Sequence, residues 1–305
     1  MLIYTARRIV LIVPLLLAVA TVTFFLMHAV QGGPFDGERP MSATLKARLD
    51  ARYGLDKPLG EQYVQYIGNL VQLDLGISFT NNREVMDIIT DRLPVSMQLG
   101  ISAFVFATVV GIGLGIISSL NQNGPGDYIG VFLATAGAAL PSFVLAPLLV
   151  WLFSLKFGWF DVLGWEFGNY RKMVLPTVAM GLLPAAFVAR ITRASMLDVL
   201  RQDYIRTARS KGAQEVRVVM RHALKNALIP VLTVLGPIFA GLITGSFIIE
   251  TAFAIPGLGR EFVRSVLVRD YGLIMGVTLF FTVVIAGMNL IVDLLYATVD
   301  PRIRL

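Results

Sequence analysis

The stretch from Leu93 to Gly126, LPVSMQLGISAFVFATVVGIGLGIISSLNQNGPG, runs for 34 residues without a charged side chain. A helix of about 20 apolar residues crosses the hydrocarbon core of a bilayer. Five further stretches also lack charge, at 9–35, 128–155, 173–189, 226–249 and 271–292. The pattern predicts an all-α, multi-pass membrane protein with six transmembrane helices, at 9–30, 97–120, 129–154, 173–189, 227–249 and 273–295.

The composition supports the same class of protein. Hydrophobic residues make up 56% of the chain and charged residues only 15%, whereas a soluble domain carries about 25% charged residues. An ordinary soluble enzyme and a disordered chain are therefore excluded. The fourth segment is the shortest, contains Pro176 and Pro184, and needs the snorkelling side chains of Arg190 and Arg193 to extend it.

The positive charge is concentrated in one loop. The chain has a net charge of +6, and residues 190–225 alone hold nine Lys or Arg against three acids. The positive-inside rule places this loop, and with six spans both termini, in the cytoplasm. Residues 31–96 hold seven basic and nine acidic residues, which suits an external segment.

These features divide the chain into three parts. Residues 1–30 form an N-terminal transmembrane helix, and residues 31–96 form an external insert with two short amphipathic helices. Residues 97–305 form a five-helix core that includes the cytoplasmic loop 190–226. The insert is either a cap packed on the outer mouth or a docking surface for an external partner, and the two are compatible.

The sequence has no catalytic or metal-binding pattern. It contains no cysteine, no phosphate-binding Gly-x-x-x-x-Gly-Lys-Ser/Thr loop and no His-Glu-x-x-His or Gly-x-Ser-x-Gly motif. Its two histidines, His28 and His222, are predicted to lie on opposite sides of the membrane. Charge-free helix centres disfavour a proton-driven carrier. We therefore expect no enzyme activity, no cofactor of its own and no nucleic-acid partner.

The loop has an internal pattern of its own. Residues 196–226 read MLDVLRQDYIRTARSKGAQEVRVVMRHALKN, and Gly212 divides them into two helical stretches. Each stretch has an apolar stripe, Leu197, Leu200, Tyr204 and Ala208 in the first and Val216, Met220, Ala223 and Ala227 in the second. The spacing predicts a helix–turn–helix bracket. A basic loop held by anionic lipid headgroups would explain the charge but not the stripes.

The bracket resembles the EAA loop of permease subunits of ATP-binding-cassette importers. Ala208, Gly212 and Leu224 match that pattern, while Arg206 stands where the motif has Glu. The runs YIRTARSKG at 204–212 and RHALK at 221–225 are similar to the peptide/nickel branch of these importers. The long insert makes the chain similar to the B-type subunit of oligopeptide and dipeptide permeases.

The resemblance extends over nearly the whole chain. It includes Ala6-Arg7-Arg8, the external run LDLGIS at 73–78, the runs GSFIIE at 245–250 and IPGLG at 255–259, and the closing VDPRI at 299–303. It implies a multi-pass permease subunit in a bacterial or archaeal cytoplasmic (inner) membrane. Its function would be ATP-driven import of oligopeptides or dipeptides.

The resemblance also implies partners and a site. The partners are a second homologous permease subunit, two ATP-binding subunits or domains that carry ATP and Mg²⁺, an external substrate-binding protein, and membrane lipid. The bracket would dock on the ATPase through Arg206, Thr207, Ala208, Arg209, Lys211, Gly212, His222 and Leu224.

Substrate-contacting residues are less specified. Polar residues in or beside the predicted spans are candidates for lining the pathway, namely Ser142, Thr244, Ser246 and Asn289. A stand-alone secondary carrier, a scaffold without transport, and an importer of nickel chelate or glutathione remain as alternatives.

Overall fold

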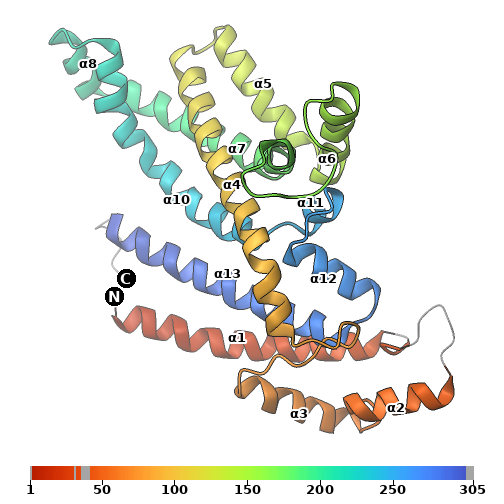
Figure 1. Cartoon of the computed structure of the whole chain (residues 1–305). Helices are drawn as coiled ribbons and strands as arrows, with labels where there is room; N and C mark the ends of the chain where they lie inside the picture. The colour runs from red at the N-terminus through yellow and green to blue at the C-terminus, as the bar shows by residue number, and fades with distance from the viewer. Residues whose placement is uncertain (1, 31, 36–41, 300–305) are drawn as a thin grey trace.

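The computed structural model describes residues 2–30, 32–35 and 42–299, and Figure 1 shows their arrangement. The described residues form helices and loops, with one isolated β-bridge between Ile77 and Glu84 and no strand. This confirms the all-α fold. Five helices are long and apolar enough to cross a membrane, or up to six when one bent pair counts as a single span.

Four long helices match predicted segments, and each extends past at least one of its predicted boundaries. They are α1 (Leu2–Ala29), α4 (Val85–Leu120), α7 (Tyr170–Leu200) and α13 (Tyr271–Val299). α4 begins inside the predicted insert and runs without a break across the 96/97 boundary. α7 has 31 residues and accommodates Pro176 and Pro184, so the segment that is shortest by its apolar run is one of the longest helices.

The third predicted span, 129–154, is not one helix. It consists of α5 (Pro125–Ala139), α6 (Ser142–Leu149) and a π-helical stretch (Val150–Lys156), and the axis bends by 108° between its halves. Leu140 adopts an extended conformation, with φ −91° and ψ 118°. The cause is Pro141, because a proline disfavours the helical conformation of the residue before it.

The fifth predicted span, 227–249, ends early. α10 (Leu224–Ile243) stops before Gly245, whose φ of +81° no continuing helix allows. The chain then reverses through two shorter helices, α11 (Phe247–Ala252) and α12 (Leu258–Leu267), before entering α13. The apolar run continues past this break, which is why hydropathy alone places the end too late.

The long helices pack through close contacts between α4 and α7. A Cβ on Gly111 would lie 2.8 Å from the carbonyl oxygen of Ala185, and one on Gly115 would lie 2.8 Å from that of Ala189. Small residues of this kind let membrane helices approach closely. Beside this contact, buried residues of α4, α6, α7, α10 and α11 form one apolar core, which includes Leu99, Ala146 and Ile249.

α1 and α13 lie side by side, with the start of one beside the end of the other (Figure 1). Arg8 and Asp293 join these ends through an ion pair of 2.8 Å. Asp293 is therefore a boundary residue of α13 and not a charge in the middle of a span. The start of α1 and the end of α13 consequently lie on one side of the molecule.

The insert forms the two helices that its spacing predicts, α2 (Ala43–Tyr53) and α3 (Leu59–Val71). Gly54 ends α2 in a left-handed conformation, with φ +69°. α3 packs on the C-terminal half of α1, where Phe24 stacks on Tyr66 with 5.6 Å between ring centroids.

The loop after α3 is fastened to the start of α13 by a buried carboxylate. Asp270, 1% exposed, accepts hydrogen bonds from Ser78 Oγ at 2.5 Å and from the backbone N–H groups of Phe79 and Thr80 at 3.0 and 3.1 Å. The insert is thus tied to the last helix as well as to the first.

Candidate functional site

The predicted bracket forms a compact unit at one end of the molecule, opposite the α2–α3 cap (Figure 1). α7 ends at Leu200, and after a two-residue turn the short helix α8 (Asp203–Ser210) begins. Gly212 then reverses the chain with φ +76°, and the next helix starts with α9 (Glu215–Arg217). The prediction that Gly212 forms the break is confirmed, whereas the second break at Arg201–Gln202 was missed.

A small apolar core holds α8 in place. Ile205, fully buried, projects from α8 into a cluster formed by Met196 of α7, Val218, Val219 and Ala223 of a π-helical stretch (Val218–Ala223), and Ala227 of α10. A hydrogen bond of 2.8 Å from Asn226 Nδ2 to the Tyr204 hydroxyl adds a polar contact. Because α8 is anchored to both α7 and α10, a force on α8 is transmitted to both helices.

The residues predicted to meet an ATPase lie on and after α8. Arg206, Thr207 and Lys211 are exposed and Ala208 is half-buried. Arg206 lies 3.6 Å from Asp203 in the same helix, in a fully exposed pair. Thr207 donates its hydroxyl hydrogen to the Asp203 carbonyl at 3.0 Å. The outer surface of α8 is therefore polar, with the exposed Arg206 guanidinium on it.

Arg209 has a different environment from the one predicted. Its guanidinium binds Glu215 across the Gly212 turn, with Nη2 at 2.6 Å from Oε1 and Nε at 3.1 Å from Oε2. This bidentate pair braces the two arms of the bracket. Arg209 and Glu215 remain partly exposed, so the bond contributes geometry more than stability.

The second apolar stripe differs from its prediction. Val216 and Met220 are 74% and 58% exposed, whereas Val218 and Val219 are buried beside Ala223 and Ala227. The cause is the π-helical stretch 218–223, where i→i+5 hydrogen bonding widens the turn and shifts the buried face. His222 is half-buried and Leu224 packs against the bracket core.

A buried ion pair lies at the base of the bracket and was missed from the sequence. Asp127 at the start of α5 is paired with Arg193 of α7 and with Ser118 of α4. Arg193 therefore does not snorkel but holds three helices together. The signal was available, because Asp127 is the one charged residue between Arg92 and Lys156.

A hollow of about 410 Å³ lies where α5, α6, α7, α10 and α11 meet. Ser142 and Ser246 line it together with Met180, Leu183, Gly245 and Ile249. Two of the four predicted pathway residues are thus brought together. Thr244 instead donates its hydroxyl hydrogen to the Gly241 carbonyl at 3.1 Å, and Asn289 lies exposed on α13.

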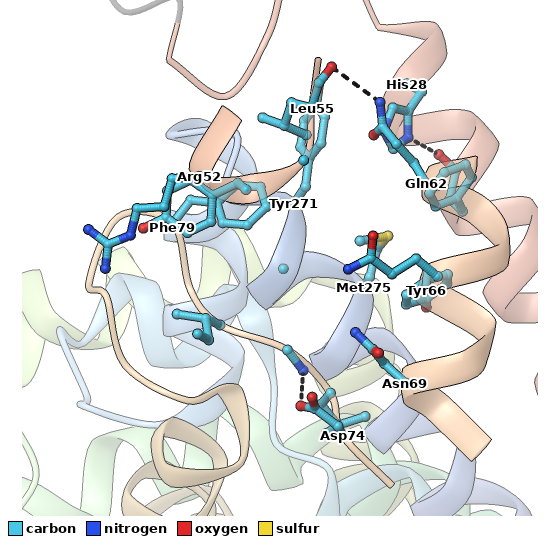
Figure 2. Close-up of a pocket in the computed structure, with 18 residues that line it drawn as sticks. His28, Arg52, Leu55, Gln62, Tyr66, Asn69, Asp74, Phe79, Tyr271 and Met275 are labelled. Atoms are coloured by element: carbon cyan, nitrogen blue, oxygen red, sulfur yellow. Dashed lines mark hydrogen bonds between the residues drawn. The ribbon is translucent and has the colours of Figure 1, made fainter. Parts of the chain in front are cut away.

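A second hollow, of about 260 Å³, lies under the cap between α1, α3 and α13 (Figure 2). Gln62 Nε2 donates to the carbonyl oxygens of Leu55 and Lys57 at 3.2 and 2.8 Å, which turns its Oε1 toward His28 Nε2 at 3.2 Å. His28 Nδ1 lies 2.8 Å from the Phe24 carbonyl oxygen. His28 therefore lies between α1 and α3 and fastens the cap to α1.

The fold and the bracket together define a membrane transport subunit. Long apolar helices surround a hollow, and two of them, α7 and α10, continue into the basic bracket beyond the apolar segments. The comparisons agree. Residues 111–305 match the family model described as binding-protein-dependent transport system inner membrane component. Residues 1–100 match the model for the N-terminal part of such a membrane component. The chain belongs to this family of inner-membrane transport components.

Curated relatives are similar over their full length. The chain is 43% identical over 305 residues to "Oligopeptide transport system permease protein OppB" of Escherichia coli (strain K12), with 100% of both chains covered. It is 43% identical over 303 residues to "Dipeptide transport system permease protein DppB" of Bacillus subtilis (strain 168), with 99% of this chain and 98% of that one covered.

Solved structures share the fold. The MetNI methionine ABC transporter in an inward-facing conformation has a chain with a TM-score of 0.56 and 15% identity, covering 70% of this chain and 97% of that one. A chain of an amino acid ABC transporter has a TM-score of 0.54 and 17% identity, with 70% and 94% covered.

Proposed function

We propose that this chain is the transmembrane permease subunit of an ATP-driven importer of oligopeptides or dipeptides. One observation carries the proposal: α8 is anchored by Ile205 in a core shared with α7 and α10, and the same two helices line the hollow. The peptide substrate is inferred from the full-length relatives, whose names assign them oligopeptide and dipeptide transport.

The bracket supplies the drive in this proposal. The exposed side of α8, with Arg206 and Thr207, docks on a cytoplasmic ATPase subunit that binds ATP and Mg²⁺. A short helix with a buried anchor transmits displacement, whereas a free loop would absorb it. Movement of α8 shifts α7 and α10 together, and Met180 of α7 and Leu242 of α10, which line the hollow, move with them.

The assembly and orientation follow from the same proposal. A second homologous permease subunit completes the pathway, two ATP-binding subunits or domains bind the brackets, and an external binding protein delivers substrate to the cap side. The bracket carries a net charge of +6 within residues 190–225, and the positive-inside rule supports a cytoplasmic side for it and for both chain termini. Lipid surrounds the exposed apolar faces of α1, where Val10 and Leu26 are 66% and 60% exposed.

The test is purification of the complex in mild detergent, mass spectrometry of the co-purifying chains, and reconstitution into liposomes. We expect uptake of labelled di- to pentapeptides that requires ATP on the bracket side and the binding protein on the other. Uptake by this chain alone under an ion gradient would instead indicate a secondary carrier. Uptake of nickel chelate or glutathione in place of peptides would overturn the peptide assignment only.

A further inference from the structure

Two runs that resemble the family, residues 245–250 and 255–259, meet around one buried acid. Glu250 of α11 has 0% of its surface exposed. Burial of a carboxyl group without compensation is costly. The contacts around Glu250 therefore indicate what the group holds in place.

Glu250 and Ser96 cap the first turn of α12 from outside that helix. Glu250 Oε2 accepts a hydrogen bond from the Arg260 backbone N–H at 2.9 Å. Ser96 Oγ, on α4 and also 0% exposed, accepts one from the Leu258 N–H at 2.8 Å, and it lies beside the Glu250 carboxylate, against the same Gly257. Gly257, at the N-cap position, has no side chain that could do this.

The carboxylate is enclosed by backbone on two sides. A Cβ on Gly245 would lie 2.2 Å from Oε1, and a Cβ on Gly257 would lie 2.4 Å from Oε2. Any larger residue at either position would displace the Glu250 side chain. The absence of a side chain at Gly245 and Gly257 thus leaves the space that the Glu250 carboxylate occupies.

This cap adjoins the hollow. Gly245, Ser246 and Ile249 form part of the hollow's wall, and Glu250 follows directly on the buried side of α11. The carboxylate therefore connects three elements: the α10–α11 wall, the start of α12, and α4 through Ser96. A displacement of one element changes its hydrogen bonds to the other two.

We propose that Glu250 and Ser96 form a latch that positions the α10–α11 wall of the hollow for substrate passage. Glu250 is the positioning residue, and Ser96 links it to α4. This inference rests on the proposed function, because passage means transport through the hollow. With the latch intact, the wall moves with α4 and α12 during the transport cycle; with the latch broken, the wall lags and ATP hydrolysis is spent without transport.

The test uses the complete transporter with its ATPases, reconstituted into liposomes with its binding protein. The variants are Glu250→Ala, Glu250→Gln and Ser96→Ala. The control is Glu261→Ala, because Glu261 of α12 is paired, among its described contacts, with Arg264 of its own helix, at 3.8 Å. The measurements are hydrogen exchange of the backbone amides of residues 258–261, and peptide taken up per ATP hydrolysed, with KM and kcat determined separately.

We expect Glu250→Ala to raise amide exchange at 258–261 at least tenfold and to lower peptide uptake per ATP at least fivefold through kcat. KM for the binding-protein-bound peptide should stay within twofold. Glu250→Gln should recover part of both losses, since its amide oxygen can accept from the Arg260 N–H. Ser96→Ala should raise amide exchange most at Leu258. If Glu250→Ala fails to assemble, Ser96→Ala is the variant that tests the latch.

The latch is overturned if Glu250→Ala, or Ser96→Ala in its place, leaves amide exchange and uptake per ATP as in the wild type. It is also overturned if Glu261→Ala reproduces the losses. Failure of the proposed function is distinguishable, because the wild-type complex would then show no peptide uptake while the exchange comparison would still report on the latch.

Discussion

Arg193 of α7 donates two hydrogen bonds to Asp127 of α5, from Nε to Oδ1 and from Nη2 to Oδ2, both at 2.7 Å. Asp127 is 4% exposed as a residue and also accepts from Ser118 of α4 and from the Asn123 backbone N–H. The pair joins α4, α5 and α7 at the end where the bracket begins. It therefore sets the position from which α7 enters the bracket.

Replacing one member of this pair should destabilise the protein more than expected from replacing both members together. Asp127→Leu leaves the partly buried Arg193 guanidinium, whose side chain is 29% exposed, without its carboxylate, and we expect a loss of about 1–3 kcal/mol in unfolding free energy. The double variant Asp127→Leu/Arg193→Leu should lose less than the sum of its single variants. Thermal unfolding of the detergent-solubilised protein, analysed as a double-mutant cycle, measures the coupling. Additive losses would show that the two side chains act independently.

Gly212 should tolerate only residues that accept a left-handed conformation. Its φ is +76° and an added Cβ would meet no atom within 4 Å, so the restriction is conformational and not steric. A β-branched residue is strained there by at least about 1–2 kcal/mol, and we expect Gly212→Val to uncouple ATP hydrolysis from uptake while the complex still assembles.

The matched control for Gly212→Val is Gly212→Asn, because asparagine enters the left-handed region readily. Gly212→Asn should retain at least half of the wild-type uptake per ATP. If both variants transport as the wild type does, the turn is not part of the coupling device.

Charge reversal on α8 should weaken binding of the ATPase. Arg206 is exposed and near only Asp203, at 3.6 Å, among the contacts described for it. Arg206→Glu should raise the dissociation constant of the ATPase subunit about tenfold at 50 mM salt and less at 500 mM, because salt screens exposed charges. Equal binding of wild type and variant at every salt concentration would rule out this contact.

Arg209 provides the comparison for Arg206. Its guanidinium is paired with Glu215 of the same chain. Arg209→Gln therefore breaks an ion pair within the bracket, and we do not expect it to remove a charge that contacts the ATPase. We expect a smaller change in ATPase affinity with a weaker salt dependence, and a stability loss below about 1 kcal/mol. Surface plasmon resonance of the reconstituted permease at several salt concentrations separates the two variants.

The insert should come loose from α13 when its buried anchor is lost. Asp270→Ala leaves the buried Ser78 hydroxyl and the part-buried N–H groups of Phe79 and Thr80 without their acceptor, and one buried donor without a partner costs about 1–3 kcal/mol. Amide exchange at residues 78–82 should rise strongly. Asp74→Ala serves as control, since Asp74 bonds only the nearby Gly76 N–H at 2.8 Å among its described contacts. A similar rise in both variants would contradict the anchor.

Glu250 should make the stability of the chain depend on pH. Burial raises the pKa of its carboxyl group in the folded protein, against the opposing hydrogen bonds. The folded state then binds the proton more tightly than the unfolded state, so this contribution to stability is complete below the ordinary pKa of about 4.3 and declines as pH rises toward the folded value.

Glu250→Gln stays neutral throughout and separates that effect from the rest of the chain. The melting temperature of the wild type relative to Glu250→Gln should therefore be highest near pH 4.5 and fall toward pH 7.5. A difference between the two proteins that does not change over this range would contradict the assignment.

Local sequence patterns predicted the helices well where the pattern itself is the physical cause. Charge-free runs placed α1, α4, α7 and α13, and residue spacing placed α2, α3 and the Gly212 turn. The same patterns failed at 129–154, where Pro141 breaks an apolar run, and at 216–220, where a π-helical stretch moves the buried face. A hydropathy pattern contains no information about a bend, and the α-helical period of 3.6 residues does not apply to a π-helical stretch.

The candidate site divides in the same way. The bracket was predictable because its charge, its glycine and its apolar residues are close together in the sequence. The pairing of Arg209 with Glu215 was not predictable, because Glu215 becomes a neighbour only after the chain reverses at Gly212. Ser142 and Ser246, a hundred residues apart, line one hollow, which no local pattern indicates.

By itself, the sequence determined that this is a multi-pass helical protein with one basic bracket, because the length of an apolar run and the balance of charge in a loop are local quantities. Only the tertiary structure decided which buried charges have which partners. Asp127 meets Arg193, Asp270 meets Ser78, and the cap on α12 comes from α4 and α11. A carboxylate in an apolar interior must be compensated, yet the groups that compensate it come from distant parts of the chain, and packing alone brings them together.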